Sequence, residues 1–302
     1  MTAMKNRMGR ANDAIGAVVA VDNLSFSYDT TPVLQELDLS VNAGEVVCLL
    51  GPNGVGKTTL VENLLGSLTP TSGAIRVLGL DPRRAGAEFW ARVGLVQQNW
   101  TDHAKWRVSD QLEWIRAIQM TAAPSAMGVT DVLDAVGLTN KATYRLSRLS
   151  GGQRRAIDFA AALMGHPELL IMDEPTTGLD PVSKAHLHDL ILQRVDDDNA
   201  TILMTTHDLA EAERLASRVL IMSRGHIIAD GSVTALRERL GHDAEVTWIQ
   251  DGERHVHTTA APERFLTQLD LGTITGLTIT RPTLEETYLS LVGNPPHEEQ
   301  QS

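Results

Sequence analysis

The stretch EVVCLLGPNGVGKTTL, residues 45–60, decides the fold class of this chain. Its first half is an apolar run of strand length, and its second half is rich in glycine and ends in residues that favour a helix. The spacing G-x-x-x-x-G-K-[ST], which begins at Gly51, is typical of a loop that binds phosphates between a strand and a helix. The sequence therefore predicts an α/β fold with a phosphate-binding loop at the end of one strand.

Each part of this loop has a chemical use. Gly54 and Gly56 let backbone N–H groups converge on phosphate oxygens, and the helix that follows presents its positive end. We expect Lys57 to reach the β- and γ-phosphates and the Thr58 hydroxyl to bind Mg²⁺. A glycine-rich loop with a purely structural role is the alternative. The candidate nucleotide-binding residues here are Gly51, Pro52, Asn53, Gly54, Val55, Gly56, Lys57, Thr58 and Thr59.

Two later apolar strands end in residues suited to hydrolysis. LLIMDE ends in Asp173 and Glu174, which point in opposite directions if they continue the strand. Asp173 is expected to hold Mg²⁺, and Glu174 to orient and polarise the attacking water, a role worth about 100-fold to 10,000-fold in rate. His207 ends TILMTTH, where open α/β sheets gather residues that contact ligands. The alternatives are a solvated acidic strand end and a structural histidine.

Composition sets the limits on function. The chain has 302 residues, of which 42% are hydrophobic, and this is enough for one large α/β domain and a smaller one. The net charge of -12 argues against non-specific binding to nucleic acid or anionic lipid. The longest apolar runs are far shorter than the roughly 20 residues that cross a bilayer, so no membrane span is expected. The single Cys48 is expected to be a buried, reduced strand residue.

The domain organisation follows from changes in pattern along the chain. We expect a disordered N-terminus over 1–16 without a secretory signal, and a main domain over 17–240 with a helical subdomain at about 99–165. A small α+β domain is expected over 241–293, beginning with the hairpin EVTWI-QDGE-RHVHTT and closing with the helix TLEETYLSLV. Residues 294–302 are expected to form a disordered tail.

A second glycine pair lies in LSGGQ, residues 149–153. Ser150 is a good helix N-cap, and QRRAIDFAAALM continues as a helix. Gly151 and Gly152 have no side chains, so their backbone amides are accessible to a ligand. The positive end of this helix suits an anion. The stretch is therefore either a second anion site or merely a capped helix start.

GPNGVGKTT, LSGGQ, LLIMDE, TTGLD and TTH occur in that order, and together they make residues 18–235 resemble the nucleotide-binding subunit of an ATP-binding cassette (ABC) transporter. The resemblance implies a P-loop NTPase core with an antiparallel β subdomain and a helical insertion. It also implies ATP and Mg²⁺ as cofactors, a homodimer, and a separate transmembrane permease that holds the subunit at the cytoplasmic face of the cell membrane. No nucleic acid partner is expected.

The resemblance also assigns roles to residues. In the family, the LSGGQ motif closes over the γ-phosphate of ATP bound to the opposite subunit, which implies that role for Ser150, Gly151, Gly152 and Gln153. Tyr28 matches an aromatic residue that stacks on adenine. Gln98 matches a glutamine that senses Mg²⁺ and the membrane subunit, although the neighbouring Gln97 leaves the register open. Asp180 matches a segment that crosses the dimer interface.

The ending RPTLEETYLSLVG, residues 281–293, resembles that of ABC-2 type ATPases that export drugs, lipids or polysaccharides. An importer ATPase, a soluble cassette ATPase acting on DNA or ribosomes, and a regulator without transport are the alternatives. Soluble cassette ATPases usually carry paired cassettes, coiled-coil insertions or basic surfaces, and this chain has one phosphate loop, no heptads and a negative charge. The sequence therefore favours an exporter ATPase.

Two groups of side chains allow more than one interpretation. Trp90, Trp100, Trp106 and Trp114 lie near the glutamine segment and the start of the helical insertion, where they could form a docking surface for the membrane subunit or fill a core. His255 and His257 share a strand face and could bind a metal, but an exposed strand is the favoured interpretation because no further ligand is evident.

Overall fold

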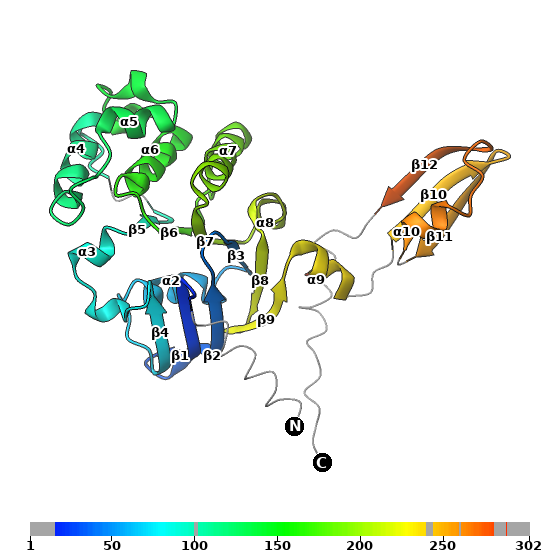
Figure 1. The fold of residues 1–302 in the computed structure, drawn as a ribbon, viewed down its shortest axis with the longest axis horizontal. Helices are drawn as coiled ribbons and strands as arrows, with labels where there is room; N and C mark the ends of the chain where they lie inside the picture. Colours follow the sequence, from blue (N-terminus) through cyan, green and yellow to red (C-terminus); the bar gives the residue numbers. More distant parts are fainter. Residues whose placement is uncertain (1–15, 100–101, 240–243, 260, 281–287, 289–302) are drawn as a thin grey trace, which may run out of the picture. The chain divides into compact units, whose positions relative to one another are not determined.

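The computed structural model describes residues 16–99, 102–239, 244–259, 261–280 and 288 (Figure 1). The chain divides into two compact units, Met1–Ile227 and Ile228–Ser302. The domain limits expected from the sequence stay a prediction. Apart from residues 16 and 288, the termini expected to be disordered and the expected closing helix lie outside the described residues.

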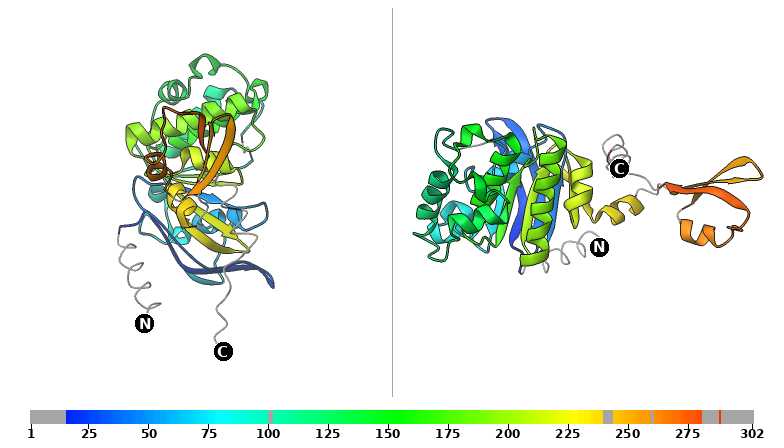
Figure 2. Two further views of the ribbon diagram at one scale, coloured as in Figure 1. Left: turned by 90° about the vertical axis from the view of Figure 1, so that its right-hand side faces the viewer. Right: turned by 90° about the horizontal axis from the view of Figure 1, so that it is seen from above.

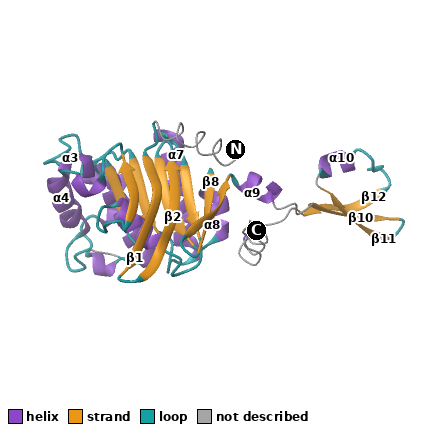
Figure 3. Ribbon diagram, turned by 90° about the horizontal axis from the view of Figure 1, so that it is seen from below, coloured by secondary structure: helices purple, strands orange, loops and turns teal. Residues whose placement is uncertain are grey.

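The first unit is built on a six-stranded sheet with the order β5-β6-β7-β3-β8-β9, whose last strand crosses the division between the units. Neighbouring strands from β5 to β8 run parallel. β3, β6 and β7 are buried along their whole length, as expected for a parallel sheet with helices on both faces (Figure 3). The strands are β3 (Val46–Leu50), β5 (Val93–Val96), β6 (Leu169–Asp173), β7 (Thr201–Thr206), β8 (Arg218–Ser223) and β9 (His226–Gly231).

An antiparallel sheet of β1 (Val19–Tyr28), β2 (Thr31–Val41) and β4 (Ser72–Val77) completes the first unit. One hydrophobic core joins this sheet to β3 and to helix α2 (Lys57–Leu64). Its members Leu24, Leu37, Leu49 and Leu60 are each at most 1% exposed. This shared core holds α2 firmly at the end of β3.

Helices α4, α5 and α6 gather at one end of the first unit, away from β8 (Figures 1 and 2). They form the expected helical insertion, and α6 also contacts β5. The remaining helices of the unit cover the sheet. The helices are α3 (Ala87–Trp90), α4 (Val108–Gln119), α5 (Val129–Ala135), α6 (Gly151–Leu163), α7 (Pro181–Asp198) and α8 (Leu209–Leu215), with 3-10 segments at Pro82–Arg84, Thr139–Lys141 and Leu146–Arg148.

The structure separates the tryptophans that the sequence groups together. Trp90 packs edge-to-face on Phe89 and contacts the hydrophobic core. Trp106 and Trp114 lie edge-to-face at 6.0 Å with 38% and 46% of their surface exposed. Trp100 lies outside the described residues. A docking surface at the exposed pair stays a prediction.

The second unit contains helix α9 (Val233–Arg239) and a three-stranded antiparallel sheet. Its strands are β10 (Ala244–Gln250), β11 (Glu253–Thr259) and β12 (Ile274–Thr280), and the short helix α10 (Pro262–Leu266) packs on β10. The expected hairpin is confirmed, with Asp251 and Gly252 both at positive φ in its turn.

His255 and His257 do lie on one face of that hairpin, as expected from the strand period. The His255 ring stacks on Trp248 at 5.2 Å, and the His257 ring stacks on Phe265 at 3.8 Å. Strand β11 is mostly exposed, as the favoured interpretation predicted: His257 is exposed and His255 is half-buried. The ring contacts add packing within the hairpin for His255 and with α10 for His257. Within the described ranges, no helix is long and apolar enough to cross a membrane.

Candidate functional site

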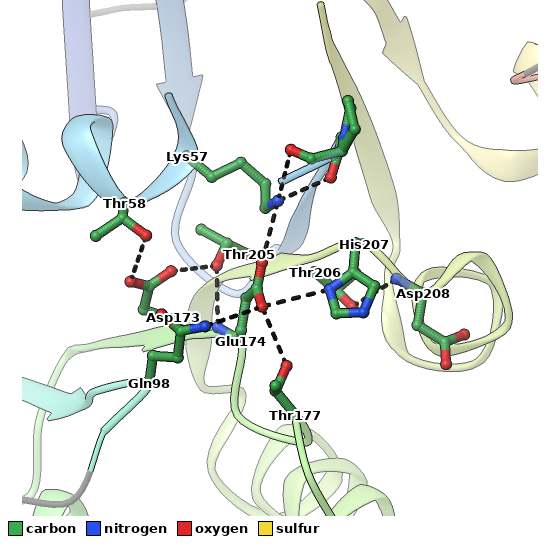
Figure 4. A network of polar contacts seen from close by, with 12 residues as sticks. Lys57, Thr58, Gln98, Asp173, Glu174, Thr177, Thr205, Thr206, His207 and Asp208 are labelled. Atoms are coloured by element: carbon green, nitrogen blue, oxygen red, sulfur yellow. Dashed lines mark hydrogen bonds and ion pairs between the residues drawn. The ribbon is translucent and has the colours of Figure 1, made fainter. Parts of the chain in front are cut away.

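The parallel register brings three strand ends together at one edge of the six-stranded sheet. Leu50 at the end of β3 pairs with Thr206 of β7, and Asp173 at the end of β6 pairs with Thr205. The loops that leave these strands therefore begin side by side. They carry the predicted phosphate loop, Glu174 and His207 to the same place (Figure 4).

The phosphate loop needs its glycines for two separate reasons. Gly54 and Gly56 have φ of 80° and 109°, which disfavour a residue with a Cβ. A Cβ on Gly56 would in addition lie 2.9 Å from Leu34 Cδ2 and 3.0 Å from Met222 Cε, whereas one on Gly54 would meet nothing within 4 Å. No side chain caps the N-terminus of α2, so its first amides stay available to an anion.

The Lys57 ammonium lies at the centre of this loop. It donates to the carbonyl oxygens of Gly51 and Pro52 at 2.7 and 3.1 Å, and it lies 3.1 Å from Glu174 Oε1. The side chains of Lys57 and Glu174 are 4% and 7% exposed. Val55 and Thr59 are buried as well, whereas Pro52 and Asn53 are exposed.

The predicted Mg²⁺ ligands meet directly. The Thr58 hydroxyl donates to Asp173 Oδ2 at 2.9 Å, and the Thr205 hydroxyl donates to Asp173 Oδ1 at 2.5 Å. A carboxylate and a hydroxyl are the hard oxygen ligands that Mg²⁺ accepts beside substrate phosphates. The donor set therefore fits the metal that the sequence predicts.

Glu174 differs from its neighbour because it leaves the strand. Its φ of 46° is left-handed, a strained conformation for a residue other than glycine, and its amide is held by the carbonyl and hydroxyl oxygens of Thr205. Its Oε2 accepts from Gln98 Nε2 at 3.3 Å and from the Thr177 hydroxyl at 3.1 Å, and lies 3.3 Å from His207 Nδ1. The two adjacent carboxylates thus occupy different environments.

The surroundings of Glu174 keep its carboxylate ionised. Burial by itself raises the pKa of this group, but the hydrogen bond and charge of Lys57 lower it, and Thr177 and His207 act in the same direction. The net effect is a pKa below the usual value of a glutamate. An ionised carboxylate with one oxygen facing Lys57 and the other facing Gln98 and His207 can polarise a water molecule.

The structure also places the remaining predicted residues. Gln98, not Gln97, directs its side-chain amide to Glu174. This contact favours Gln98 as the residue that matches the family's glutamine. Tyr28 is 48% exposed at the end of β1, lies edge-to-face on Phe26 and donates to Glu62 Oε2 at 3.3 Å. Its ring therefore has an exposed surface on which a base could stack.

The LSGGQ motif begins α6 as expected. The Ser150 hydroxyl accepts from the Gln153 amide, and Gln153 Oε1 accepts from the Ser150 amide, both at 3.2 Å. Gly152 has a packing role that sequence reasoning missed, because a Cβ there would lie 2.0 Å from Ser183 Oγ in the first turn of α7. Asp180 caps α7 through the amides of Val182 and Ser183.

Two threonines of the site were also missed. Thr177 and Thr205 contact Glu174 and Asp173, and they lie inside the motifs TTGLD and TTH, from which only Asp180 and His207 were selected. The doubled threonines were the available signal, since consecutive strand residues such as Thr205 and Thr206 point to opposite faces and one of the two hydroxyls therefore faces the site.

Comparison with known proteins agrees with this geometry. A family model described as ABC transporter matches residues 34–177. Nod factor export ATP-binding protein I of Rhizobium meliloti (strain 1021) is 35% identical in an alignment that is 302 positions long with its gaps included. The alignment covers 91% of this chain and 88% of that protein. This chain belongs to the ABC transporter family.

Further similarities extend the assignment to an ABC ATPase. Linearmycin resistance ATP-binding protein LnrL of Bacillus subtilis (strain 168) is 34% identical over 236 residues, covering 78% of this chain and 76% of the relative. A solved ATP-binding subunit of an ABC transporter has a TM-score of 0.66 and 25% identity, covering 74% of this chain and 93% of its own. The chain is the ATP-binding subunit of an ABC transporter, as the resemblance of its motifs implied.

A second solved structure supports the fold alone. It is a dimeric ATP-binding cassette in a post-hydrolysis state with ADP and phosphate, with a TM-score of 0.63 and 22% identity, covering 71% of this chain and 98% of its own. The ABC ATPase core predicted from the sequence, with its antiparallel sheet and its helical insertion, is therefore confirmed.

Proposed function

We propose that this ABC ATPase drives an exporter by hydrolysing ATP in a homodimer attached to a separate permease at the inner face of the cell membrane. The observation that carries the export direction is the extent of one similarity. The relative named for Nod factor export matches 91% of this chain, so the match reaches well beyond the cassette that importers and exporters share. The proposed cargo is of the drug, lipid or polysaccharide type, and the relative named for linearmycin resistance supports a drug-type cargo.

The proposed chemistry divides the site into a cradle and a water-activating group. The amides of Gly54 and Gly56 and the Lys57 ammonium hold the β- and γ-phosphates, and Thr58 and Asp173, with Gln98, hold Mg²⁺. Mg²⁺, when bound, neutralises charge that develops on the phosphate oxygens. Tyr28 stacks on the adenine ring. These roles follow from the donor types and from their meeting at one sheet edge.

Glu174 is the proposed base. Its carboxylate is ionised at neutral pH, and the contacts from Thr177, Gln98 and His207 fix the orientation of Oε2. A fixed acceptor of this kind orients the attacking water and takes up its proton as the water oxygen bonds to the γ-phosphorus, while the bond from that phosphorus to the β–γ bridging oxygen breaks and ADP leaves. His207 lies 3.3 Å from Glu174 and has 46% of its side chain exposed, and its proposed second contact is with the transferred phosphate.

The second anion site supports the homodimer. Ser150, Gly151, Gly152 and Gln153 begin the 13-residue helix α6, whose positive end suits a phosphate. Each subunit would then supply one phosphate loop and one LSGGQ helix to two shared sites, with Asp180 at the start of α7 near the boundary between them.

The test of this function is the replacement Glu174→Gln, which keeps the shape of the side chain and removes its charge. We expect Mg²⁺-dependent ATP turnover to fall at least 100-fold, because the proton acceptor is lost while the cradle remains. With ATP and Mg²⁺, light scattering should then show a dimer that persists. Glu88→Gln, at an exposed position of α3, is the matched control.

Either of two results would contradict the proposal. Unchanged turnover in Glu174→Gln would remove the assigned base, and a monomer under all nucleotide conditions would remove the shared sites. The attachment to a permease has its own test, which is purification of the tagged protein from gently solubilised native membranes. A stoichiometric membrane-spanning chain supports it, whereas recovery of ribosomes or nucleic-acid factors would favour a soluble cassette ATPase.

A further inference from the structure

Two arginines follow the LSGGQ motif directly, and neither was assigned a role from the sequence. Arg154 and Arg155 lie in the first turns of α6, and both reach across to the segment that leaves β5. That segment contains Gln98, which contacts the proposed base. The helix that begins at the second anion site is thereby connected to the first site.

Arg155 makes the closer of the two connections. Its Nη1 donates to the carbonyl oxygen of Gln97 at 2.5 Å, and its Nη2 donates to the carbonyl oxygen of Gln98 at 2.7 Å. The residue is 2% exposed, so these bonds compensate the desolvation of a full charge. The planar guanidinium reaches the two carbonyls from two separate nitrogens held in a fixed fork, whereas a lysine ammonium has its three N–H donors on one nitrogen.

Arg154 holds the far end of the same segment. Its Nε donates to Asp102 Oδ2 at 2.9 Å, and its Nη2 bonds to Asp102 Oδ1. The side chains of Arg154 and Asp102 are 18% and 7% exposed, which protects the bidentate pair from solvent screening. Two consecutive residues of α6 therefore fix Gln97, Gln98 and Asp102.

Asp158 is a weaker partner of Arg155. It lies one turn further along α6, with Oδ2 at 3.6 Å from Nη1 of Arg155, which is longer than either carbonyl bond. Burial raises the pKa of Asp158 to about 7, against the opposing effect of the nearby Arg155, so this carboxylate is only partly charged at neutral pH. The two backbone carbonyls therefore lie closer to the guanidinium than the Asp158 carboxylate does.

We propose that Arg155 is a positioning residue for ATP hydrolysis, which holds the Gln98 backbone so that the Gln98 side chain meets Glu174. The Gln98 amide lies 3.3 Å from Glu174 Oε2, a distance that a small rotation of the backbone would lose. The inference rests on the proposed function, because it deepens the role of that site. It also means that any movement of α6 on contact with the partner's nucleotide is transmitted to Gln98.

The first test is Arg155→Lys, which keeps the charge and removes the fork. We expect kcat to fall about tenfold and KM for ATP to stay within about twofold, because the phosphate cradle is untouched while the base is less well oriented. Arg92→Lys is the matched control, since Arg92 forms an exposed bidentate pair with Glu168 outside the site. It should leave kcat and KM unchanged.

A double-mutant cycle separates positioning from a merely structural effect. If Arg155 acts through Gln98, the variant that combines Arg155→Lys with Gln98→Ala should be no slower than Gln98→Ala alone. The proposal would be overturned if the fold-loss in kcat of the double variant equalled the product of the fold-losses of the two single variants. An unchanged kcat in Arg155→Lys would also overturn it. Should the lysine variant fail to fold, Arg155→Met, which fills the same space without donors, replaces it in the cycle and is interpreted in the same way.

Failure of this inference is distinguishable from failure of the proposed function. The wild-type chain and Glu174→Gln report on hydrolysis by themselves. If wild-type turnover is lost in Glu174→Gln while the arginine variants behave additively, the ATPase assignment stands and only the role of Arg155 is contradicted.

Discussion

At the scale of residues, Asp173 and Glu174 show how two neighbouring carboxylates acquire different chemistry. Asp173 ends β6 and accepts hydroxyl donors, whereas Glu174 turns to positive φ and meets a cation, an amide and an imidazole. Thr205 holds both, since its hydroxyl donates to Asp173 and accepts from the Glu174 amide. The difference in function is therefore created by backbone conformation as much as by side-chain type.

The phosphate loop offers a test of backbone strain against packing. We expect Gly56→Ala to lower the free energy of unfolding by about 2 to 4 kcal/mol, because it adds positive-φ strain to a clash with Leu34 and Met222. Gly54→Ala, with strain and open space around its Cβ, should lower it by only about 1 kcal/mol. Urea unfolding measures both. Equal losses would show that the packing around Gly56 relaxes.

At the scale of elements, α6 is the part of the fold with the most separate tasks. Its N-terminus is the proposed second anion site, and Ser150 caps it by accepting from the backbone N–H of Gln153, the third residue of the helix. Gly152 lets α7 approach closely, and the side chains of Arg154 and Arg155 bond to the segment after β5. An element that contacts so many others is expected to move as a rigid body.

The buried acid of α6 makes stability depend on pH. Because the pKa of Asp158 is raised to about 7 by burial, the folded chain binds a proton that the unfolded chain has lost, over the range from the ordinary aspartate pKa up to about 7. Stability from this group is present at low pH and falls as pH rises through that range. Asp158→Asn removes the effect.

The corresponding measurement is urea unfolding of wild type and Asp158→Asn at pH 5.5 and pH 8. Relative to wild type, the variant should gain about 2 kcal/mol between the two pH values, an order-of-magnitude figure from the size of the shift. Other titrating groups occur in both proteins and cancel in the comparison. A difference between the proteins that does not change with pH would contradict the assignment.

At the scale of the whole molecule, the chain carries two compact units, and every residue proposed to touch ATP or Mg²⁺ lies in the first. Nucleotide binding should therefore stabilise one unit and leave the other as it was. The second unit has its own contacts between the hairpin and α10, in which the half-buried Phe265 ring meets the buried Trp248 and the exposed His257.

Calorimetry can test this independence. With ATP and Mg²⁺ at about 100 times the dissociation constant, the first unit should gain about 2.7 kcal/mol. Its unfolding transition should rise by about 5 to 10 °C. The transition of the second unit should not move, and Lys57→Ala should abolish the shift. A single transition that moves as a whole would show that the two units unfold together.

Much of the site was predictable because its parts are local. The phosphate loop, the LSGGQ helix start and the hairpin turn are each determined by a few consecutive residues, whose glycines, caps and apolar runs have fixed structural consequences. The order of β and α segments likewise predicts a mainly parallel sheet, which places several strand ends at one edge.

The sequence by itself determined which chemical groups are present and that they converge on one sheet edge, since spacing controls local conformation. Only the tertiary structure decided how they combine. Glu174 is shared by Lys57, Gln98 and His207, which come from three separate segments. Arg155 binds backbone carbonyls, which every residue possesses and which therefore leave no sequence signal. Contacts of these two kinds depend on packing between distant segments, and a spacing pattern cannot contain them.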